Sequence, residues 1–335
     1  MKVLLTGAFG NVGLSTLEEL IKKGYDVRVF DVKTKKNVKI SRRYERRIEI
    51  IWGDLRNQND VERAVEGQNV VIHVAAIIPP LADRNPKFAE EVNVGGTSNI
   101  IKAMEKQPDK PKLIYTSSIA IYGDRRQSPL IKPTDPPNPN SDDEYAKQKL
   151  KCENLIKHSK LKWVIFRLTY IVSPDKIKMD PLMFKMPLDT YLEICHTKDV
   201  GTALTDAIES DEIWGKVMHI AGGEECRLTY REYIDKMMDI FGLGKGFLPD
   251  EAFSKENFHC GFMTTEESQK ALGYQKHSME HYFNEVRRKV GVKRYFMKML
   301  KPLIRIYLLR NSPYYKEFLR RTKSSWDKTH TKEGL

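Results

Sequence analysis

The stretch that decides the fold is Gly7-Ala8-Phe9-Gly10-Asn11-Val12-Gly13, which directly follows the apolar run Lys2–Thr6. Three glycines at a spacing of three, after a strand and at the start of a helix, are typical of a loop that binds a dinucleotide. Gly7 permits a tight turn, Gly10 lets the backbone approach a pyrophosphate, and Gly13 allows close helix packing. An ordinary strand-to-helix turn is the alternative. We predict that six residues of this loop contact the cofactor, namely Gly7, Phe9, Gly10, Asn11, Val12 and Gly13.

Asp31 indicates which dinucleotide the loop binds. It ends the second predicted strand, 18 residues beyond Gly13, where a carboxylate accepts hydrogen bonds from the ribose hydroxyls of NAD and repels the 2′-phosphate of NADP. Lys33, Lys35 and Lys36 follow closely and could bind that phosphate, or form a merely solvated basic loop. Because the carboxylate at the strand tip is the more local determinant, we predict NAD as the cofactor.

The pattern around this loop predicts an α/β fold. Short β-branched runs alternate with helical stretches through the first two thirds of the chain, which predicts βαβ units and a doubly wound parallel (Rossmann) sheet. Beyond residue 220 the pattern changes to helical stretches without strand rhythm, which predicts a smaller, mostly helical lobe and a C-terminal helical tail. The predicted strands are 2–6, 26–30, 48–52, 69–74, 112–117, 163–168 and 216–220, and the predicted helices are 12–23, 60–66, 88–105, 144–158, 229–241 and 264–272.

We predict three parts from these patterns: an NAD-binding Rossmann domain, a substrate-binding lobe and a basic amphipathic tail. Five prolines between Pro129 and Pro139 predict a loop in the first part. The parts comprise residues 1–172 with 196–222, residues 173–195 with 223–290, and residues 291–335, respectively.

A second motif, Tyr145-Ala146-Lys147-Gln148-Lys149, puts Tyr145 and Lys149 on one helix face, one turn apart. A phenol is a poor base at neutral pH, and a neighbouring ammonium stabilises its phenolate. Such pairs also occur by chance on solvated helices. Thr116-Ser117-Ser118 strengthens the interpretation, because these hydroxyls end a predicted strand, where ligands of parallel sheets bind. One of them could hold the carbinol oxygen of a substrate, or merely cap the strand end.

Together these residues resemble the extended short-chain dehydrogenases/reductases, the NAD-dependent epimerase/dehydratase family. The resemblance covers about residues 1–222. It implies a catalytic triad of Ser118, Tyr145 and Lys149, with Ser118 preferred over Ser117 because it lies five residues before Gly123. The matching segments, in family order, are the glycine loop, Asp31, Gly53-Asp54-Leu55, His73-Val74-Ala75-Ala76, Asn93-Val94-Gly95-Gly96-Thr97, residues 115–123, the Tyr145/Lys149 pair and Arg167.

The resemblance also implies where the cofactor lies. Asp54 and Leu55 are expected near the adenine, Ala75 and Ala76 along the cofactor, and Asn93 near the nicotinamide half. The remaining expected cofactor contacts come from the catalytic region itself, through Ser117, Tyr145 and Lys149.

The chain departs from the family at two places. Ile119-Ala120 follows the predicted active serine, where sugar dehydratases and decarboxylases usually have acidic residues. An apolar pair cannot transfer protons, so 4,6-dehydration is disfavoured. Leu192-Glu193-Ile194-Cys195 stands where nucleotide-sugar enzymes usually have a diphosphate-binding arginine, so that bidentate cation is missing there. The apolar stretch 179–191 is either core or the wall of a hydrophobic pocket.

The function implied is that of an NAD-dependent oxidoreductase in which Tyr145 moves a proton to or from a carbinol. Family prevalence favours a sugar epimerase-like isomerase. Nucleotide-sugar enzymes of the family usually have a long insertion after the arginine strand, whereas only 28 residues separate Arg167 from His196 here. This short insertion and the missing arginine favour instead a dehydrogenase or reductase of a non-nucleotide substrate, such as a sugar acid or a hydroxysteroid-like molecule. A non-catalytic NAD-sensing protein is a third possibility, against which the intact set of Ser118, Tyr145 and Lys149 weighs.

Charge is concentrated in two segments of a chain with a net charge of +12. Residues 33–47 carry a net +7 and residues 293–323 a net +9. No zinc, helix-turn-helix or aromatic RNA-binding signature accompanies this charge, so we predict no nucleic-acid partner. In the second segment, helical spacing places four basic residues on one stripe beside a wide apolar arc. The body of the protein, a homodimer partner or a membrane surface could cover that arc. The stripe consists of Arg294, Lys298, Lys301 and Arg305.

The cysteines and the N-terminus indicate in which cellular compartment the protein is expected. Cys152, Cys195, Cys226 and Cys260 are spaced neither as a metal site nor as a dense disulfide framework. Gly7 comes too early for the apolar core of a signal peptide, and no apolar window is long enough for a spanning helix. We therefore expect no metal site and a cytoplasmic protein, peripheral to the inner face of the membrane if the tail binds lipid.

Overall fold

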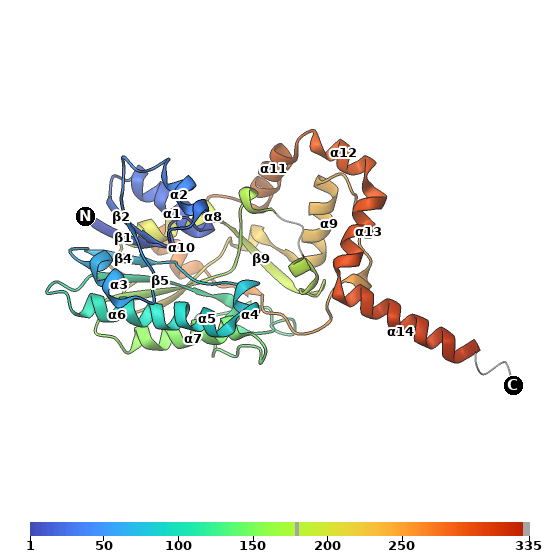
Figure 1. Ribbon diagram of the computed structural model, residues 1–335, viewed down its shortest axis with the longest axis horizontal. Coiled ribbons are helices and arrows are strands. Elements are labelled where there is room, and N and C mark those ends of the chain that lie inside the picture. The colour runs from blue at the N-terminus through green and yellow to red at the C-terminus, as the bar shows by residue number, and fades with distance from the viewer. Residues whose placement is uncertain (178–180, 331–335) are drawn as a thin grey trace.

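The computed structural model describes residues 1–177 and 181–330 (Figure 1). Seven parallel strands form its central sheet in the order β10-β7-β5-β4-β1-β2-β3. Each predicted strand is confirmed to within one residue at each end, and so is the predicted Rossmann sheet. The strands are β1 (Lys2–Thr6), β2 (Asp26–Asp31), β3 (Glu49–Trp52), β4 (Val70–His73), β5 (Lys112–Ser118), β7 (Trp163–Leu168) and β10 (Val217–Ile220).

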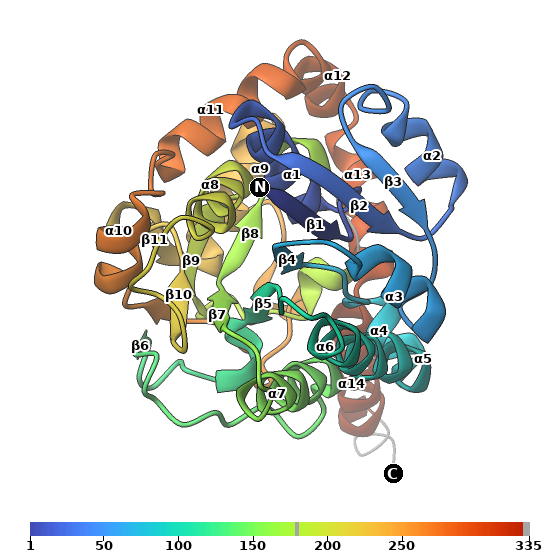
Figure 2. The same cartoon turned by 90° about the vertical axis from the view of Figure 1, so that its left-hand side faces the viewer.

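Helices cover both faces of this sheet (Figure 2). On one face α1 (Asn11–Lys22) packs against α8 (Thr197–Asp206), and Leu17 and Leu204 lie in their shared core. The helices of the other face and of the adjoining loops are α3 (Gln58–Val65), α4 (Leu81–Arg84), α5 (Pro86–Glu90), α6 (Gly96–Glu105) and α7 (Glu144–Lys157), and α2 (Lys35–Ser41) follows β2. The predicted helix 88–105 is interrupted by a π-helical turn at Glu91–Gly95.

The smaller lobe contains strands as well as helices. β8 (Tyr170–Val172), β9 (Tyr191–His196) and β11 (Arg227–Thr229) form a three-stranded sheet, and β12 (Phe262–Met263) pairs with β6 (Leu130–Ile131). The expectation of no strand beyond residue 220, and of only a loop at the prolines, is therefore wrong. Strands of two or three residues carry no periodic signal, and partners distant in sequence stabilise them. The lobe helices are α9 (Tyr230–Ile240) and α11 (Met279–Val290), whereas α10 (Glu266–Leu272) packs against β10 and α8.

Pairing of β8 with β9 links the two main parts of the chain, and the exact domain division stays a prediction. The tail forms α12 (Lys293–Met299), α13 (Lys301–Asn311) and α14 (Pro313–His330). Its helices break beside Pro302 and Pro313, because proline lacks the N–H that continues a helix. The last helix extends away from the body (Figure 1).

Candidate functional site

The glycine loop closes tightly at the carboxyl end of β1. Gly7 has a φ of +68°, a region that strongly favours glycine. A Cβ added to Gly7 would lie 2.7 Å from the Cα of Ala75, and one added to Gly13 would lie 2.1 Å from the Gly7 carbonyl oxygen. Gly10 precedes α1 without a side-chain cap, so backbone N–H groups at the helix start remain available to an anion.

Asp31 is anchored beside this loop. One carboxylate oxygen accepts from the Phe9 backbone N–H at 3.1 Å, and the other accepts from the Val32 N–H at 2.8 Å and the Asn37 amide at 3.1 Å. Burial raises the pKa of Asp31, while the backbone hydrogen bonds and Lys36 act in the opposite direction. Since a carboxylate offers about four acceptor positions, one remains for a hydroxyl group. The geometry therefore fits the ribose of a dinucleotide.

The other predicted loop residues line the same strand ends. Phe9 is buried against Trp52, with ring centroids 5.6 Å apart, so its backbone and not its ring faces the loop. Asn11 and Val12 begin α1 and are half-buried. The Ala75 N–H donates to the Thr6 hydroxyl at 3.3 Å, and the half-buried Ala76 follows it.

Three predicted cofactor residues already have partners within the protein. Leu55 is buried in the core, and Arg56 holds the Asp54 carboxylate at 2.6 Å. The Asn93 side chain accepts from the Ile77 N–H at 2.7 Å and donates to the Ile77 carbonyl at 2.9 Å and to Gln148 at 2.8 Å. Asn93 therefore holds the loop after β4 against α7, a positioning role that its sequence motif does not reveal.

The structure brings Ser118, Tyr145 and Lys149 together. Ser118 ends β5, and Tyr145 and Lys149 lie one turn apart on α7. The Lys149 ammonium donates to the Thr116 carbonyl oxygen at 2.7 Å and lies 5.9 Å from the centroid of the Tyr145 ring. The Asp143 carboxylate starts α7 by accepting from the Ala146 N–H at 2.9 Å, so a helix cap sets the position of Tyr145.

Burial is the main cause of the pKa shifts at this site. It raises the pKa of Tyr145 above its ordinary value, the Asp143 charge adds to this effect, and a hydrogen bond with Ser118 opposes it. Burial lowers the pKa of Lys149 to about 8. Without further positive charge, Tyr145 is therefore a neutral phenol, and it needs a nearby cation to act as a base.

Tyr115 is a site residue that the sequence analysis did not assign. Its hydroxyl accepts from the Lys149 ammonium at 3.2 Å, and its ring is buried. Ser117, predicted to contact the cofactor, is buried on the same side of β5, where its hydroxyl has no hydrogen-bond partner among the described residues. The alternation of strand residues placed both side chains on this face. The Ser117 side chain therefore points to the opposite face of β5 from the Ser118 side chain.

A cavity of about 730 Å³ reaches from the start of α7 into the lobe. Its wall is mainly apolar and aromatic. Among residues 1–177 and 181–330 its lining includes one lysine, Lys185, and no arginine. The apolar and aromatic lining includes Tyr170, Ile171, Leu182, Met183, Met186, Tyr230, Tyr233, Met237, Phe241, Tyr282 and Tyr314, and the acidic lining consists of Asp83, Asp142, Asp143, Glu144 and Glu256.

The cavity shows which of the described residues in the apolar stretch 179–191 belong to the core and which line a pocket. Phe184 is fully buried in the lobe core, whereas Leu182 and Met183 line the cavity. Met179 lies outside the described residues. Both interpretations of the stretch are therefore correct, for different residues. Glu193, where an arginine was missing, is buried and bonds Arg227 at 3.1 Å.

His259 is a second residue missed by sequence analysis. It lines the cavity, and its Nδ1 lies 2.8 Å from an Asp143 carboxylate oxygen. Burial alone would raise the pKa of Asp143, but the hydrogen bond and charge of His259 outweigh it and hold that pKa below its ordinary value. No local pattern marks His259, because its partner is 116 residues away in the chain.

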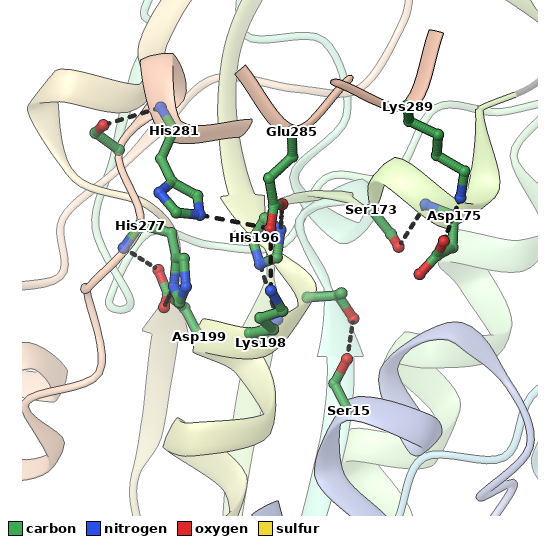
Figure 3. A network of polar contacts seen from close by, with 12 residues as sticks. Ser15, Ser173, Asp175, His196, Lys198, Asp199, His277, His281, Glu285 and Lys289 are labelled. Carbon is green, nitrogen blue, oxygen red and sulfur yellow. Dashed lines mark hydrogen bonds and ion pairs between the residues drawn. The ribbon is translucent and has the colours of Figure 1, made fainter. Parts of the chain in front are cut away.

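A separate polar network joins the lobe to the Rossmann sheet (Figure 3). His196 bonds Glu285 of α11 at 2.9 Å, and His277 bonds the buried Asp199 of α8 at 2.5 Å. The two imidazole rings stack with centroids 4.7 Å apart. In the part of the chain that the structure describes, no His, Cys, Asp and Glu cluster could hold a metal ion, so this network is interpreted as a structural joint. The four cysteines are free and buried.

Comparison with known proteins gives matches to part of the chain. Residues 4–164 match the 3-beta hydroxysteroid dehydrogenase/isomerase family. The chain is 31% identical over 133 residues to a CDP-paratose 2-epimerase from Salmonella typhi, covering 38% of this chain and 39% of that protein. It is 33% identical over 123 residues to 3 beta-hydroxysteroid dehydrogenase type 7 from Homo sapiens, covering 36% and 33%. The matches thus span well under half of these relatives.

Solved structures resemble almost the whole chain. A UDP-glucose 4-epimerase from Thermotoga maritima superposes with a TM-score of 0.71 at 21% identity, covering 90% of this chain and 100% of that one. A short-chain dehydrogenase/reductase superfamily protein from Agrobacterium tumefaciens does so with a TM-score of 0.69 at 17% identity, covering 90% and 99%. At these identities the likeness shows the fold.

Proposed function

We propose, from the premise that this chain belongs to the extended short-chain dehydrogenases/reductases, that it is an NAD-dependent oxidoreductase of a secondary alcohol or ketone. One observation carries the proposal. Ser118, Tyr145 and Lys149, from two elements, converge at the carboxyl edge of the parallel sheet beside the glycine loop. A regulatory protein that only senses NAD would not need this set of proton-transfer groups.

The glycine loop and Asp31 support NAD as the cofactor. The loop N–H groups at the start of α1 would hold the pyrophosphate, and the remaining acceptor position of Asp31 would take a ribose hydroxyl. When bound, NAD supplies a hydride acceptor at its nicotinamide ring and a positive charge beside Tyr145.

The reaction uses Tyr145 as the group that moves a proton. Its phenolate takes the proton of the substrate hydroxyl, while Ser118 holds the same oxygen in place. Lys149, fixed by the Thr116 carbonyl and Tyr115, stabilises the phenolate. If the carbonyl product is reduced again on its opposite face, the outcome is epimerisation. If it leaves, the outcome is net oxidation.

A sugar epimerase-like reaction is supported by the relatives, because the CDP-paratose 2-epimerase from Salmonella typhi is 31% identical over 38% of the chain. A specific observation favours a second candidate, a dehydrogenase or reductase of a non-nucleotide substrate. The cavity wall is mainly apolar with five acidic residues, and its described lining has no arginine to bind a diphosphate. Such a lining suits an uncharged, largely apolar alcohol or ketone, of which hydroxysteroid-like molecules are one class.

Dehydration of a hexose remains disfavoured. Ile119 and Ala120 are both buried, at 3% and 0% exposure, so the two residues after the active serine pack in the core. Neither the residue types nor their positions offer an acid or base to the substrate. We therefore expect proton transfer from Tyr145 alone.

For partners, we propose a small-molecule substrate in the cavity and a peripheral membrane contact through residues 293–323, with a homodimer as the alternative. No helix in the described part of the chain has the length and apolar character needed to cross a bilayer. The contact is therefore proposed as a surface one, at the cytoplasmic side.

The test of the function is NAD binding by calorimetry, followed by a search for NADH formation with sugars, uronates and sterols. Turnover of any secondary alcohol that Tyr145→Phe abolishes would support the proposal. Tight NAD binding without turnover of any of these substrate classes would favour the sensing protein.

A further inference from the structure

The tail helices expose many large apolar side chains. Eight of them between positions 292 and 307 are 43–72% exposed. Within α12 and within α13 they recur every three or four residues, the spacing of one helix face. We call this surface the exposed tail face, and it consists of Val292, Tyr295, Phe296, Met299, Leu300, Leu303, Ile306 and Tyr307.

This face is not the one by which the tail docks on the body. Ile304 and Leu308 point to the lobe core, and Leu308 is only 2% exposed. Ser312 is buried and donates its hydroxyl to the Ala252 carbonyl oxygen at 2.6 Å. Docking on the body therefore covers one apolar side of the tail and leaves another open. A soluble surface rarely exposes so many neighbouring apolar side chains without a partner.

We propose that the exposed tail face docks on an anionic lipid bilayer. The tail segment 293–323 carries a net charge of +9, and its one acid, Glu317, is paired with Arg321. A second copy of the chain would bring a second +9 against the first, and the cores of protein interfaces are depleted of charge. An anionic lipid surface attracts the same charge by about 1 kcal/mol per basic residue. The charge therefore favours lipid over a homodimer.

The basic residues of the tail differ in what they contact. Two residues of the predicted basic stripe contact the body, because Arg305 donates to the Phe247 carbonyl oxygen at 3.1 Å and Lys301 lies 5.7 Å from the centroid of the Phe247 ring. Arg310 instead follows Ile306 and Tyr307 by four and three positions, on the exposed side. Further exposed charges come from α14, namely Lys316, Arg320, Arg321 and Lys323. These five residues are the expected headgroup contacts.

The tail also forms part of the cavity wall, through Tyr314. Tyr314 lies six positions after the docked Leu308 and seven positions after Tyr307 of the exposed tail face. One short segment thus connects the lipid-facing surface with the substrate cavity. If the proposed function is right, bilayer docking brings the cavity wall close to the headgroups, so that an apolar substrate can enter from the lipid phase.

The first test is flotation of the full-length protein with vesicles of phosphatidylcholine containing phosphatidylserine, at low salt. We expect Phe296→Ser combined with Leu303→Ser to lower vesicle binding at least tenfold. The matched control removes two exposed leucines elsewhere, Leu130→Ser with Leu155→Ser, and should bind as the native chain does. Equal binding by both double variants, or no binding by the native chain, would overturn the proposal.

The second test separates charge from apolar contact. Arg310→Gln, Lys316→Gln, Arg320→Gln and Arg321→Gln together should abolish the preference for phosphatidylserine over pure phosphatidylcholine vesicles. The control with the same net charge changes Lys39, Arg42, Arg46 and Arg47 to Gln in the other basic segment, and should keep that preference. Equal loss in both would mean that net charge, and not this surface, drives binding.

Light scattering in the absence of lipid tests whether a second copy of the chain, instead of lipid, covers the exposed tail face. A dimer that Phe296→Ser with Leu303→Ser dissociates, without vesicle binding by the native chain, would assign the face to a second copy. NAD affinity, measured on every variant, reports folding of the Rossmann domain. Because vesicle binding needs no turnover, failure of the proposed catalytic function would leave these results interpretable.

Discussion

His259 Nδ1 lies 2.8 Å from the carboxylate of Asp143, the residue that caps the helix carrying Tyr145. This contact ties a loop of the lobe to the start of α7, two residues before Tyr145. The Asp143 charge is one of the causes that raise the pKa of Tyr145. The lobe can therefore influence proton transfer through a single carboxylate.

Asp143→Asn tests this influence. Asparagine caps a helix about as well as aspartate, so α7 should persist, while the negative charge beside Tyr145 is lost. We expect the pKa of Tyr145 to fall, and the pH profile of kcat/KM for alcohol oxidation to move to lower pH by about one unit. An unchanged profile, or a move to higher pH, would contradict this relationship.

Tyr145→Phe tests the proton-transfer role directly. The ring remains and only the hydroxyl is lost, so NAD affinity should stay nearly unchanged while turnover falls at least about 100-fold. Tyr115→Phe is the matched control, because it removes a partner of Lys149 and leaves the reacting phenol in place. Steady-state kinetics with calorimetry measure both, and near-native turnover by the Tyr145 variant would rule out the mechanism.

Asp31→Ala tests cofactor choice. The native protein should bind NAD more tightly than NADP, because the carboxylate accepts a ribose hydroxyl and repels a phosphate. Hydrogen bonds to charged groups are worth about 1.5–3 kcal/mol, so the affinity of the variant for NAD should fall about tenfold or more. The difference between its affinities for NAD and NADP should therefore be smaller than in the native protein. Asp31→Asn keeps an acceptor for the Phe9 N–H and controls for damage to the loop. Tighter binding of NADP by the native protein would reverse the assignment.

Lys149→Met tests the buried ammonium through stability. Burial lowers the pKa of Lys149 from 10.5 to about 8. Between these two pH values the unfolded chain binds a proton that the folded chain has lost, so this group makes the folded state more stable as pH rises, by about 3 kcal/mol in total. Below pH 8 both states are protonated and the contribution is constant.

The expected result is therefore a difference in slope. The free energy of unfolding of the native chain, relative to that of Lys149→Met, should increase between pH 8 and 10.5. Urea unfolding of the two chains without cofactor, at several pH values in this range, measures it. A relative stability that is constant or falls with pH would mean that Lys149 is not buried as a cation.

The local features of the site could be predicted from the sequence because each depends on residues close together in the chain. The positive φ of Gly7 follows from its place at a strand end, and the seven sheet strands follow from short β-branched runs. Tyr145 and Lys149 share a face because four residues make about one helical turn. The face of β5 on which Ser117 lies could also have been predicted from the alternation of the strand, which places it on the same side as Tyr115.

Contacts between distant segments were decided only by the tertiary structure. Asp143 and His259 meet across 116 residues, and the cavity takes its wall from the segment after β4, the start of α7, the lobe and the tail. The apolar arc of the tail was readable as a pattern, but a helical pattern does not say which side meets the body. Packing of Leu308 against the lobe decided that, and thereby left Phe296 and Leu303 facing outward. Periodicity depends on the local backbone geometry, whereas burial depends on which distant surfaces the folded chain brings together.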